Sequence, residues 1–314
     1  MNILDPHGPA ASNLAALTVW VLVVFSVVAV VMWVLIVWPA LRRRGTLAEH
    51  APAGSGGGQA WILVGGLIVP FAILAAVFVA SLNSIRGFPL HGDHAMGPAE
   101  IRVLGHQWWW EVRYLGEPPQ QFPTANEIHL PAGRPVDVDL VSGDVIHSLW
   151  IPGLHGKVDL IPGRTNRIRL QADRPGIYQG QCAEFCGEQH AHMRLVVVAD
   201  TPADYVVWKA AQRGPAITPH TPELLVGQQV FLSRPCALCH AVRGTPAQGG
   251  VAPDLTHLAS RRGLAANILP NDRAALSAWV TGAQSIKPGA RMPNVAQMDG
   301  AEQRALVHYL ESLH

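Results

Sequence analysis

The strongest constraint on this chain is a pair of long, uncharged apolar runs near its N-terminus. Residues 14–38 form a run of 25 residues without a charged side chain, and residues 61–82 form a second run of 22. At a rise of 1.5 Å per residue, helices of these lengths extend about 37 and 33 Å, whereas the hydrocarbon core of a bilayer is about 30 Å thick. Both runs therefore predict transmembrane helices.

The residues around the first run predict its orientation. A cleaved signal peptide is the competing interpretation, but such peptides begin with basic residues and have a shorter apolar stretch. Here Asp5 precedes the run without any Lys or Arg, and Arg42, Arg43 and Arg44 follow it. Short loops rich in Lys and Arg stay on the cytoplasmic side. We therefore expect both termini, and all residues after the second run, on the outer side of the membrane.

The composition excludes some classes of function. Only 14% of the residues are charged, against about 25% in an average soluble protein. The formal net charge of +1 argues against a nucleic-acid partner, because phosphate binding requires a strongly basic surface. Four cysteines are too few for a disulfide scaffold, so each cysteine needs a local explanation.

The pattern along the chain predicts several domains. Residues 1–94 are expected to form a transmembrane hairpin. In residues 95–200, short alternating segments such as 136–140 (Val-Asp-Val-Asp-Leu) predict an antiparallel β-sandwich or barrel. Residues 201–222 contain a predicted helix, 202–213, and a Pro-rich linker. Residues 223–314 are helical in pattern.

The first cysteine pair predicts a metal site. Cys182, Cys186, His190 and Met193 place two thiolates, an imidazole and a thioether within twelve residues. A disulfide and a structural zinc site are the alternatives. The thioether favours copper, because Met is a poor zinc ligand and a common axial ligand of electron-transfer copper.

A histidine far from this loop strengthens the copper interpretation. His147 lies in a β-rich segment, 35 residues before Cys182. Together with the two apolar runs, the segment Gly-His-Gln-Trp-Trp-Trp at 105–110 and the loop Cys-Xaa-Glu-Xaa-Cys-Xaa3-His-Xaa2-Met, it resembles subunit II of the haem-copper oxidases over residues 14–200. The resemblance implies a cupredoxin-like Greek-key sandwich that carries a dinuclear CuA centre.

The resemblance also implies a role for each residue. The copper ions would be held by the bridging thiolates of Cys182 and Cys186 and by the terminal imidazoles of His147 and His190. The Met193 thioether and the Glu184 backbone carbonyl would complete the set of ligands. The Glu184 side chain would face a magnesium site shared with subunit I. Trp108 would be the surface aromatic through which electrons reach CuA. On a strand, Trp108 and Trp110 would face one side and Trp109 the other.

The second cysteine pair predicts a covalently attached haem. Cys236-Ala-Leu-Cys239-His240 is the attachment pattern of c-type haem, with His240 as one axial ligand. Met292 is the expected second axial ligand, and Met298 is its rival. A zinc site is the alternative, but it would need more ligands nearby.

The surrounding segment resembles a class I cytochrome c. Gly227 and Phe231 before the haem motif, and Leu306 and Tyr309 near the C-terminus, match the residues of that family's helix crossing. Thioether attachment in bacteria takes place outside the cytoplasmic membrane, which agrees with the orientation inferred from the arginines. We therefore expect a multi-pass protein of the bacterial inner membrane with both redox domains on the periplasmic side.

A cytochrome c domain fused behind a CuA subunit resembles the caa-type cytochrome c oxidases. The resemblance implies electron flow from an external cytochrome c through the attached haem and CuA to subunit I, where oxygen is reduced and protons are pumped. Subunits I and III are the implied partners. Two alternatives remain open at this point: the CuA subunit of a nitric oxide reductase, and a free-standing membrane-tethered electron carrier.

Overall fold

The computed structural model describes residues 2–42, 58–86, 97–295 and 298–314 of the chain. It consists of two compact units, Ser12–Phe88 and Met1–Ala11 together with Pro89–His314. Arg43 and Arg44, which contribute to the expected orientation, lie outside the described residues.

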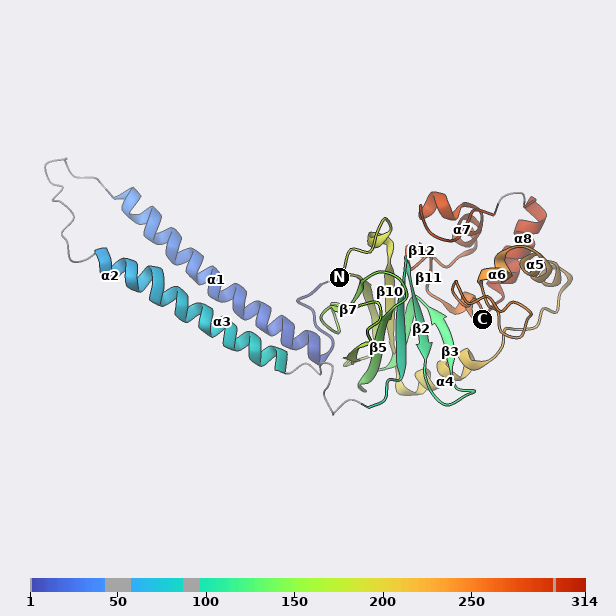
Figure 1. Ribbon diagram of the computed structural model, residues 1–314, viewed down its shortest axis with the longest axis horizontal. Helices are drawn as coiled ribbons and strands as arrows, with labels where there is room; N and C mark the ends of the chain where they lie inside the picture. The colour runs from blue at the N-terminus through green and yellow to red at the C-terminus, as the bar shows by residue number, and fades with distance from the viewer. Residues whose placement is uncertain (1, 43–57, 87–96, 296–297) are drawn as a thin grey trace. The chain divides into compact units, whose positions relative to one another are not determined.

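The smaller unit contains the two predicted membrane spans (Figure 1). The helical segments are α1 (Pro9–Leu41), α2 (Gly58–Leu63), the π-helical turn η2 (Val64–Ile68) and α3 (Val69–Arg86). By length and composition, Pro9–Leu41 and Gly58–Ile85 are candidate spans, and their most apolar windows are not buried within the protein. Both helical segments extend a few residues beyond the uncharged runs at each end.

A sandwich of two five-stranded sheets forms the first part of the larger unit. One sheet has the order β3-β2-β1-β5-β8 and the other β4-β10-β9-β6-β7. The strands are β1 (Ile101–His106), β2 (Trp109–Tyr114), β3 (Phe122–Ala125), β4 (Glu127–Pro131), β5 (Val136–Ser142), β6 (His147–Trp150), β7 (Val158–Leu160), β8 (Asn166–Leu170), β9 (Gly176–Cys182) and β10 (Arg194–Asp200). The core between the sheets contains Trp110, Tyr114, Leu130 and Leu149.

The expectation of a purely antiparallel sandwich is wrong at two pairs of strands. β1 pairs with β5 in parallel, and β4 pairs with β10 in parallel. An alternating pattern reports which side chains face the core, but it does not report the direction of the neighbouring strand.

The expected single strand through the three tryptophans is also wrong. β1 ends at His106 and β2 begins at Trp109, and these two residues pair across a hairpin whose turn contains Gln107 and Trp108. Trp110 is buried in the core and Trp109 stacks on His106 at 4.7 Å. Trp108 is therefore a turn residue at the end of the sheet.

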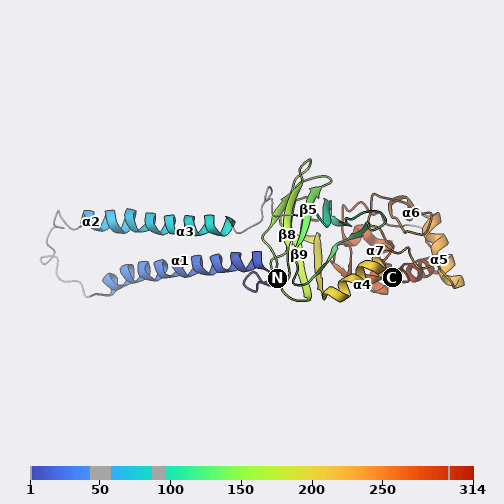
Figure 2. The ribbon, with the colours of Figure 1, turned by 90° about the horizontal axis from the view of Figure 1, so that it is seen from below.

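The C-terminal part is helical, as predicted (Figure 2), and its described residues also form one small two-stranded sheet, which is labelled in Figure 1. Its elements are α4 (Pro202–Arg213), α5 (Pro222–Ser233), α6 (Cys236–Cys239), η4 (Leu258–Ser260), β11 (Gly263–Leu264), β12 (Leu269–Pro270), α7 (Arg273–Ile286) and α8 (Gly300–Glu311). Thr201, Thr221 and Asp299 cap α4, α5 and α8 by accepting backbone N–H groups, which explains where these helices begin.

The predicted helix crossing is confirmed between α5 and α8. A Cβ atom at Gly227 would overlap with the carbonyl oxygen of Ala305, so only glycine allows the two backbones to come this close. Phe231 and Tyr309 are buried beside it, with ring centroids 6.0 Å apart.

A buried charge cluster lies where α4 packs against β4 and β10. His129 lies between two carboxylates, with Nε2 2.7 Å from Glu127 and Nδ1 2.7 Å from Asp200, and its ring stacks on Trp208 at 3.9 Å. Burial opposes protonation, but the hydrogen bonds to Asp200 and Glu127 raise the pKa of His129 above its usual value. The charged imidazole thus balances the buried Glu127 carboxylate and the partly buried Asp200 carboxylate.

Replacing His129 with Gln is expected to destabilise the sandwich by about 3 kcal/mol at pH 6, because it leaves the buried Glu127 carboxylate and the partly buried Asp200 carboxylate without their cation. The stabilisation by His129 is fully present below the ordinary His pKa of about 6.5 and is lost as the pH rises through the raised pKa of the folded state. Thermal unfolding of both proteins from pH 6 to pH 9 measures this. A difference that stays constant across this range would contradict the assignment of the charged form.

Candidate metal centre and haem pocket

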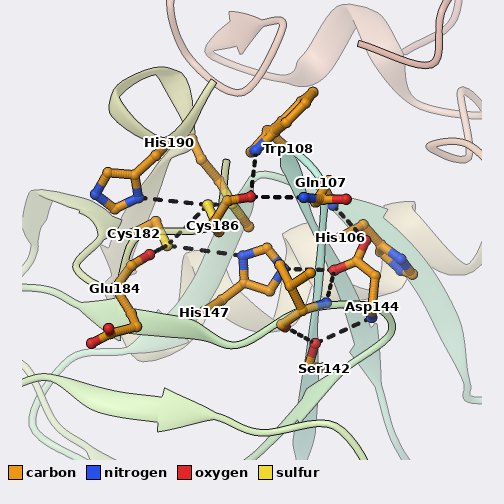
Figure 3. A network of polar contacts seen from close by, with 12 residues as sticks. His106, Gln107, Trp108, Ser142, Asp144, His147, Cys182, Glu184, Cys186 and His190 are labelled. Carbon is orange, nitrogen blue, oxygen red and sulfur yellow. Dashed lines mark hydrogen bonds and ion pairs between the residues drawn. The ribbon is translucent and has the colours of Figure 1, made fainter. Parts of the chain in front are cut away.

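The sulfur and imidazole groups expected to bind metal converge at one end of the sandwich (Figure 3). The Sγ atoms of Cys182 and Cys186 are 3.8 Å apart. His147 Nδ1 lies 3.9 Å from Cys182, and His190 Nδ1 lies 3.5 Å from Cys186. The arrangement is completed by Met193 Sδ, 3.9 Å from Cys186, and by the carbonyl oxygen of Glu184, 3.2 Å from Cys182.

The fold brings these groups together from two segments. The end of β9 and the loop that follows it, together called the metal-binding loop (residues 182–193), supply five of them. The two ends of this loop are held together because the N–H of Cys182 donates to the carbonyl of Met193 at 2.9 Å. β6 pairs with β9, with Leu149 opposite Cys182, which places His147 beside the loop. His147, Cys182, Cys186 and Met193 are buried, and His190 is partly exposed.

Two residues that the sequence did not identify support this cluster. Asp144 Oδ1 lies 2.8 Å from His147 Nε2, which orients Nδ1 toward Cys182. The other oxygen of Asp144 accepts the N–H of Gln107 at 2.7 Å, and the Gln107 side chain donates to the carbonyl of Cys186 at 2.8 Å. Asp144 stands only three residues before His147, and this spacing could have indicated its role. Gln107 belongs to the segment at 105–110 that contributes to the resemblance, but nothing in that segment assigned it a role.

The two thiols titrate as a pair. The neighbouring Cys186 thiol lowers the pKa of Cys182 to about 3, whereas Cys182 raises the pKa of Cys186. One negative charge is favoured here and a second is opposed, because the two sulfur atoms are close together. Bound cations would relieve this repulsion and allow both thiols to ionise.

The donor set fits copper better than the alternatives. The sulfur atoms are too far apart for a disulfide, whose S–S bond is about 2.05 Å, and both cysteines are free. Two thiolates, two imidazoles and a thioether form a soft ligand set, which suits copper; a structural zinc site would not need the thioether. The six donors also exceed the four that a single zinc ion takes.

The Glu184 side chain and Trp108 occupy the edges of the cluster. The Glu184 carboxylate is 45% exposed and lies 3.7 Å from Lys157 Nζ, so it faces outward. The indole N–H of Trp108 donates to the carbonyl of Cys186 at 2.9 Å. Trp108 therefore contacts the backbone of a candidate copper ligand directly.

A second candidate site is an apolar cavity in the C-terminal domain. The cavity is lined mainly by apolar side chains that include Phe231, Leu255, Leu276, Trp279, Leu306 and Leu310. Cys236, His240 and Met292 also line it, whereas Met298 packs on the neighbouring core. An apolar lining with a His, a Met and a Cys of the attachment motif fits a haem.

The polar groups of the cavity support the same assignment. His240 Nδ1 donates to the carbonyl of Pro253 at 2.7 Å, which leaves Nε2 available as a ligand. Burial lowers the pKa of His240 and favours the neutral ring that ligates metals. Arg261 lines the cavity, and its buried Nε has no hydrogen-bond partner among the described residues. The carboxylate of a haem propionate could supply that partner.

Comparisons with known proteins match both parts of the larger unit. The family described as "Cytochrome C oxidase subunit II, periplasmic domain" matches residues 115–200, and the family "Cytochrome c" matches residues 225–314. The cytochrome c oxidase subunit 2 of Alkalihalophilus pseudofirmus is 32% identical over all of this chain and 91% of its own length; that of Bacillus subtilis is 25% identical over all of this chain and 92%. A crystal structure of the periplasmic domain of cytochrome oxidase subunit II from Bradyrhizobium japonicum is 27% identical, with a TM-score of 0.34 over 38% of this chain and 95% of that domain.

Proposed function

Since this chain belongs to the cytochrome c oxidase subunit 2 family and carries a cytochrome c domain, we propose that it is the electron-accepting subunit of a respiratory cytochrome c oxidase. Electrons would pass from an external cytochrome c to the attached haem, then to CuA, and on to subunit I, where oxygen is reduced to water and protons are pumped. The observation that supports this proposal most strongly is the convergence of six donor groups in one cluster: Cys182, Cys186, His147, His190, Met193 and the Glu184 carbonyl.

Each residue of the cluster would have its own role in holding a dinuclear copper centre. When bound, such a centre supplies a one-electron relay whose charge is shared by two metal ions. Cys182 and Cys186 would bridge, and His147 and His190 would be the terminal ligands. Asp144 holds the His147 ring in place, and the buried surroundings exclude water, so little has to move when the charge changes.

In the haem pocket, fixed ligands would likewise keep movement small when the charge changes. Cys236 and Cys239 would form the thioethers, His240 and Met292 would be the axial ligands, and Arg261 would pair with a propionate. A covalently attached haem c with His and Met ligands transfers electrons and leaves no open position for oxygen. Pro253 fixes the His240 ring through its carbonyl group.

We also propose where this chain lies in the cell, how its domains divide and which subunits it binds. The chain would cross the bacterial inner membrane twice, with both termini and both redox domains in the periplasm. Its domains would be residues 1–94, 95–200, 201–222 and 223–314. Subunits I and III would be its partners, and the outward-facing Glu184 carboxylate would complete a magnesium site with subunit I.

Purification of the intact complex in mild detergent tests this function. We expect a large polytopic subunit to copurify, copper and covalent haem to be present, and ascorbate-reduced cytochrome c to drive oxygen consumption. A mixed-valence electron spin resonance signal shared by two copper ions is the expected signature of CuA. Turnover of nitric oxide without oxygen turnover would overturn the proposal, and so would a copper- and haem-loaded chain without a partner subunit.

Replacing Met292 with Leu is expected to lower the haem potential and to slow electron delivery from the external cytochrome c by about tenfold or more, because the thioether raises the potential. The copper signals should stay unchanged, since Met292 lies in the other domain. Redox titration of the haem absorption measures the effect, with Met298→Leu as the matched control. An unchanged potential in Met292→Leu, with a lowered one in Met298→Leu, would transfer the role to Met298.

A further inference from the structure

The lysine that follows α7 is buried against three backbone carbonyls. Lys287 is one of three lysines in the sequence, and it is only 3% exposed. Its Nζ donates to the carbonyl of Trp108 at 2.7 Å, of His192 at 2.8 Å and of Ala265 at 3.1 Å. The three N–H donors of an ammonium group are thereby all used.

These acceptors belong to different domains. Trp108 and His192 are part of the sandwich, where Trp108 contacts Cys186 and His192 lies between two candidate copper ligands. Ala265 lines the haem cavity, and Lys287 itself precedes the loop with Met292. One side chain thus connects the turn at Trp108, the metal-binding loop and the wall of the haem pocket.

The residues after Lys287 continue the same contact. Gln189 in the metal-binding loop donates its side-chain N–H to the carbonyl of Pro288 at 2.8 Å. Gly289 has a φ of 78°, and a Cβ atom there would lie 3.6 Å from the Trp108 ring and 2.7 Å from a Glu188 carboxylate oxygen. The chain's own haem domain therefore lies against Trp108, which stays partly exposed.

A second set of contacts joins the domains beyond Lys287. Asn126 of the sandwich lines the haem cavity, and its carbonyl accepts the side chain of Asn267 at 2.6 Å. Glu127 accepts the N–H of Arg262 at 3.0 Å. The Asn126 contact is between neutral groups, and the Glu127 carboxylate is also paired with His129, whereas Lys287 directs all three donors of its side chain into the contact.

A buried lysine is costly unless its hydrogen bonds are satisfied. Among the described residues, no carboxylate forms an ion pair with Lys287, and burial lowers the pKa of Lys287 to about 7. A non-specific contact would not retain such a group. Three carbonyls that converge on one ammonium group instead specify a single relative position of the two surfaces.

We propose that Lys287 is a positioning residue that fixes the haem domain on the copper domain, with the Met292 loop held over Trp108 and the metal-binding loop. This inference rests on the proposed function, because it assumes that an electron passes between the two sites. It adds that the haem domain reaches Trp108 and the metal-binding loop in one fixed position, set by the three hydrogen bonds of Lys287.

Amine acetylation of the purified complex tests the buried contact without using its activity. The complex is exposed briefly to an acetylating reagent, and mass spectrometry measures the acetylation of each lysine. We expect Lys287 to be modified at least about tenfold more slowly than Lys209, which lies partly exposed on α4. Equal rates would overturn the proposal. The result does not depend on copper or haem content, so it stays informative even if the proposed function fails.

The variant Lys287→Met tests positioning, and Lys209→Met is its matched control. We expect Lys287→Met to speed hydrogen exchange in residues 189–193 and 263–267, and to slow electron transfer from photoreduced haem to copper by about tenfold. The copper signal and haem absorption should stay as in the wild type. Lys287→Arg should recover part of the rate, because it keeps a buried donor. Wild-type exchange and transfer in a fully loaded Lys287→Met protein would overturn the proposal.

Discussion

Replacing Cys186 with Ser is expected to empty the copper centre and to reduce oxygen consumption by the complex at least about a hundredfold. Cys186 is the hub of the cluster, because its sulfur lies within 4 Å of Cys182, His190 and Met193. A serine hydroxyl does not ionise near neutral pH and is a hard donor, so it cannot replace a bridging thiolate. In the proposed dinuclear centre, loss of this one atom would remove a ligand from both copper ions.

Metal analysis, electron spin resonance and oxygen uptake measure this effect. Covalent haem should be retained, because its attachment residues lie in the other domain. Cys186 is buried in the sandwich core, so the substitution also perturbs packing. His190→Asn is the companion variant, since His190 is partly exposed and its loss should bleach copper without disturbing the core. A Cys186→Ser protein that keeps its copper signal and its oxygen uptake would refute the assignment.

The sequence predicted the ligand cluster because most of its members are close together along the chain. Five candidate donors lie within the twelve residues from Cys182 to Met193, so their spacing is visible without a fold. The sixth, His147, is 35 residues away, and only its resemblance to a known motif connected it to the loop. The structure places it there through the pairing of β6 with β9.

The groups that support the cluster could not be predicted in this way. Gln107, Asp144 and Lys287 contact the metal-binding loop or its neighbours from three other segments. Such contacts depend on how strands and domains pack, and the residue types involved are common on protein surfaces. The turn at Trp108 was missed for a related reason: it contains no Gly, Pro, Asn or Asp, and side-chain contacts with Cys186 hold it instead.

Replacing both Cys236 and Cys239 with Ala is expected to remove all haem that survives denaturation and to stop oxygen uptake driven by external cytochrome c. The thioethers are the only expected covalent links to the haem. Without it, the apolar cavity would lose the group that fills it, so the haem domain should also lose stability.

The copper centre provides the internal control for this double variant. The two sites are built from different domains, so copper content and copper spin signals should remain, whereas Cys186→Ser should show the reverse pattern. Haem staining of a denaturing gel measures attachment, and metal analysis measures copper on the same sample. If Cys236→Ala/Cys239→Ala retained covalent haem, the attachment site would have to be elsewhere. If the double variant lost copper as well, the two centres would not assemble independently. Folding of the metal-binding loop would then depend on the haem domain through the contact at Lys287.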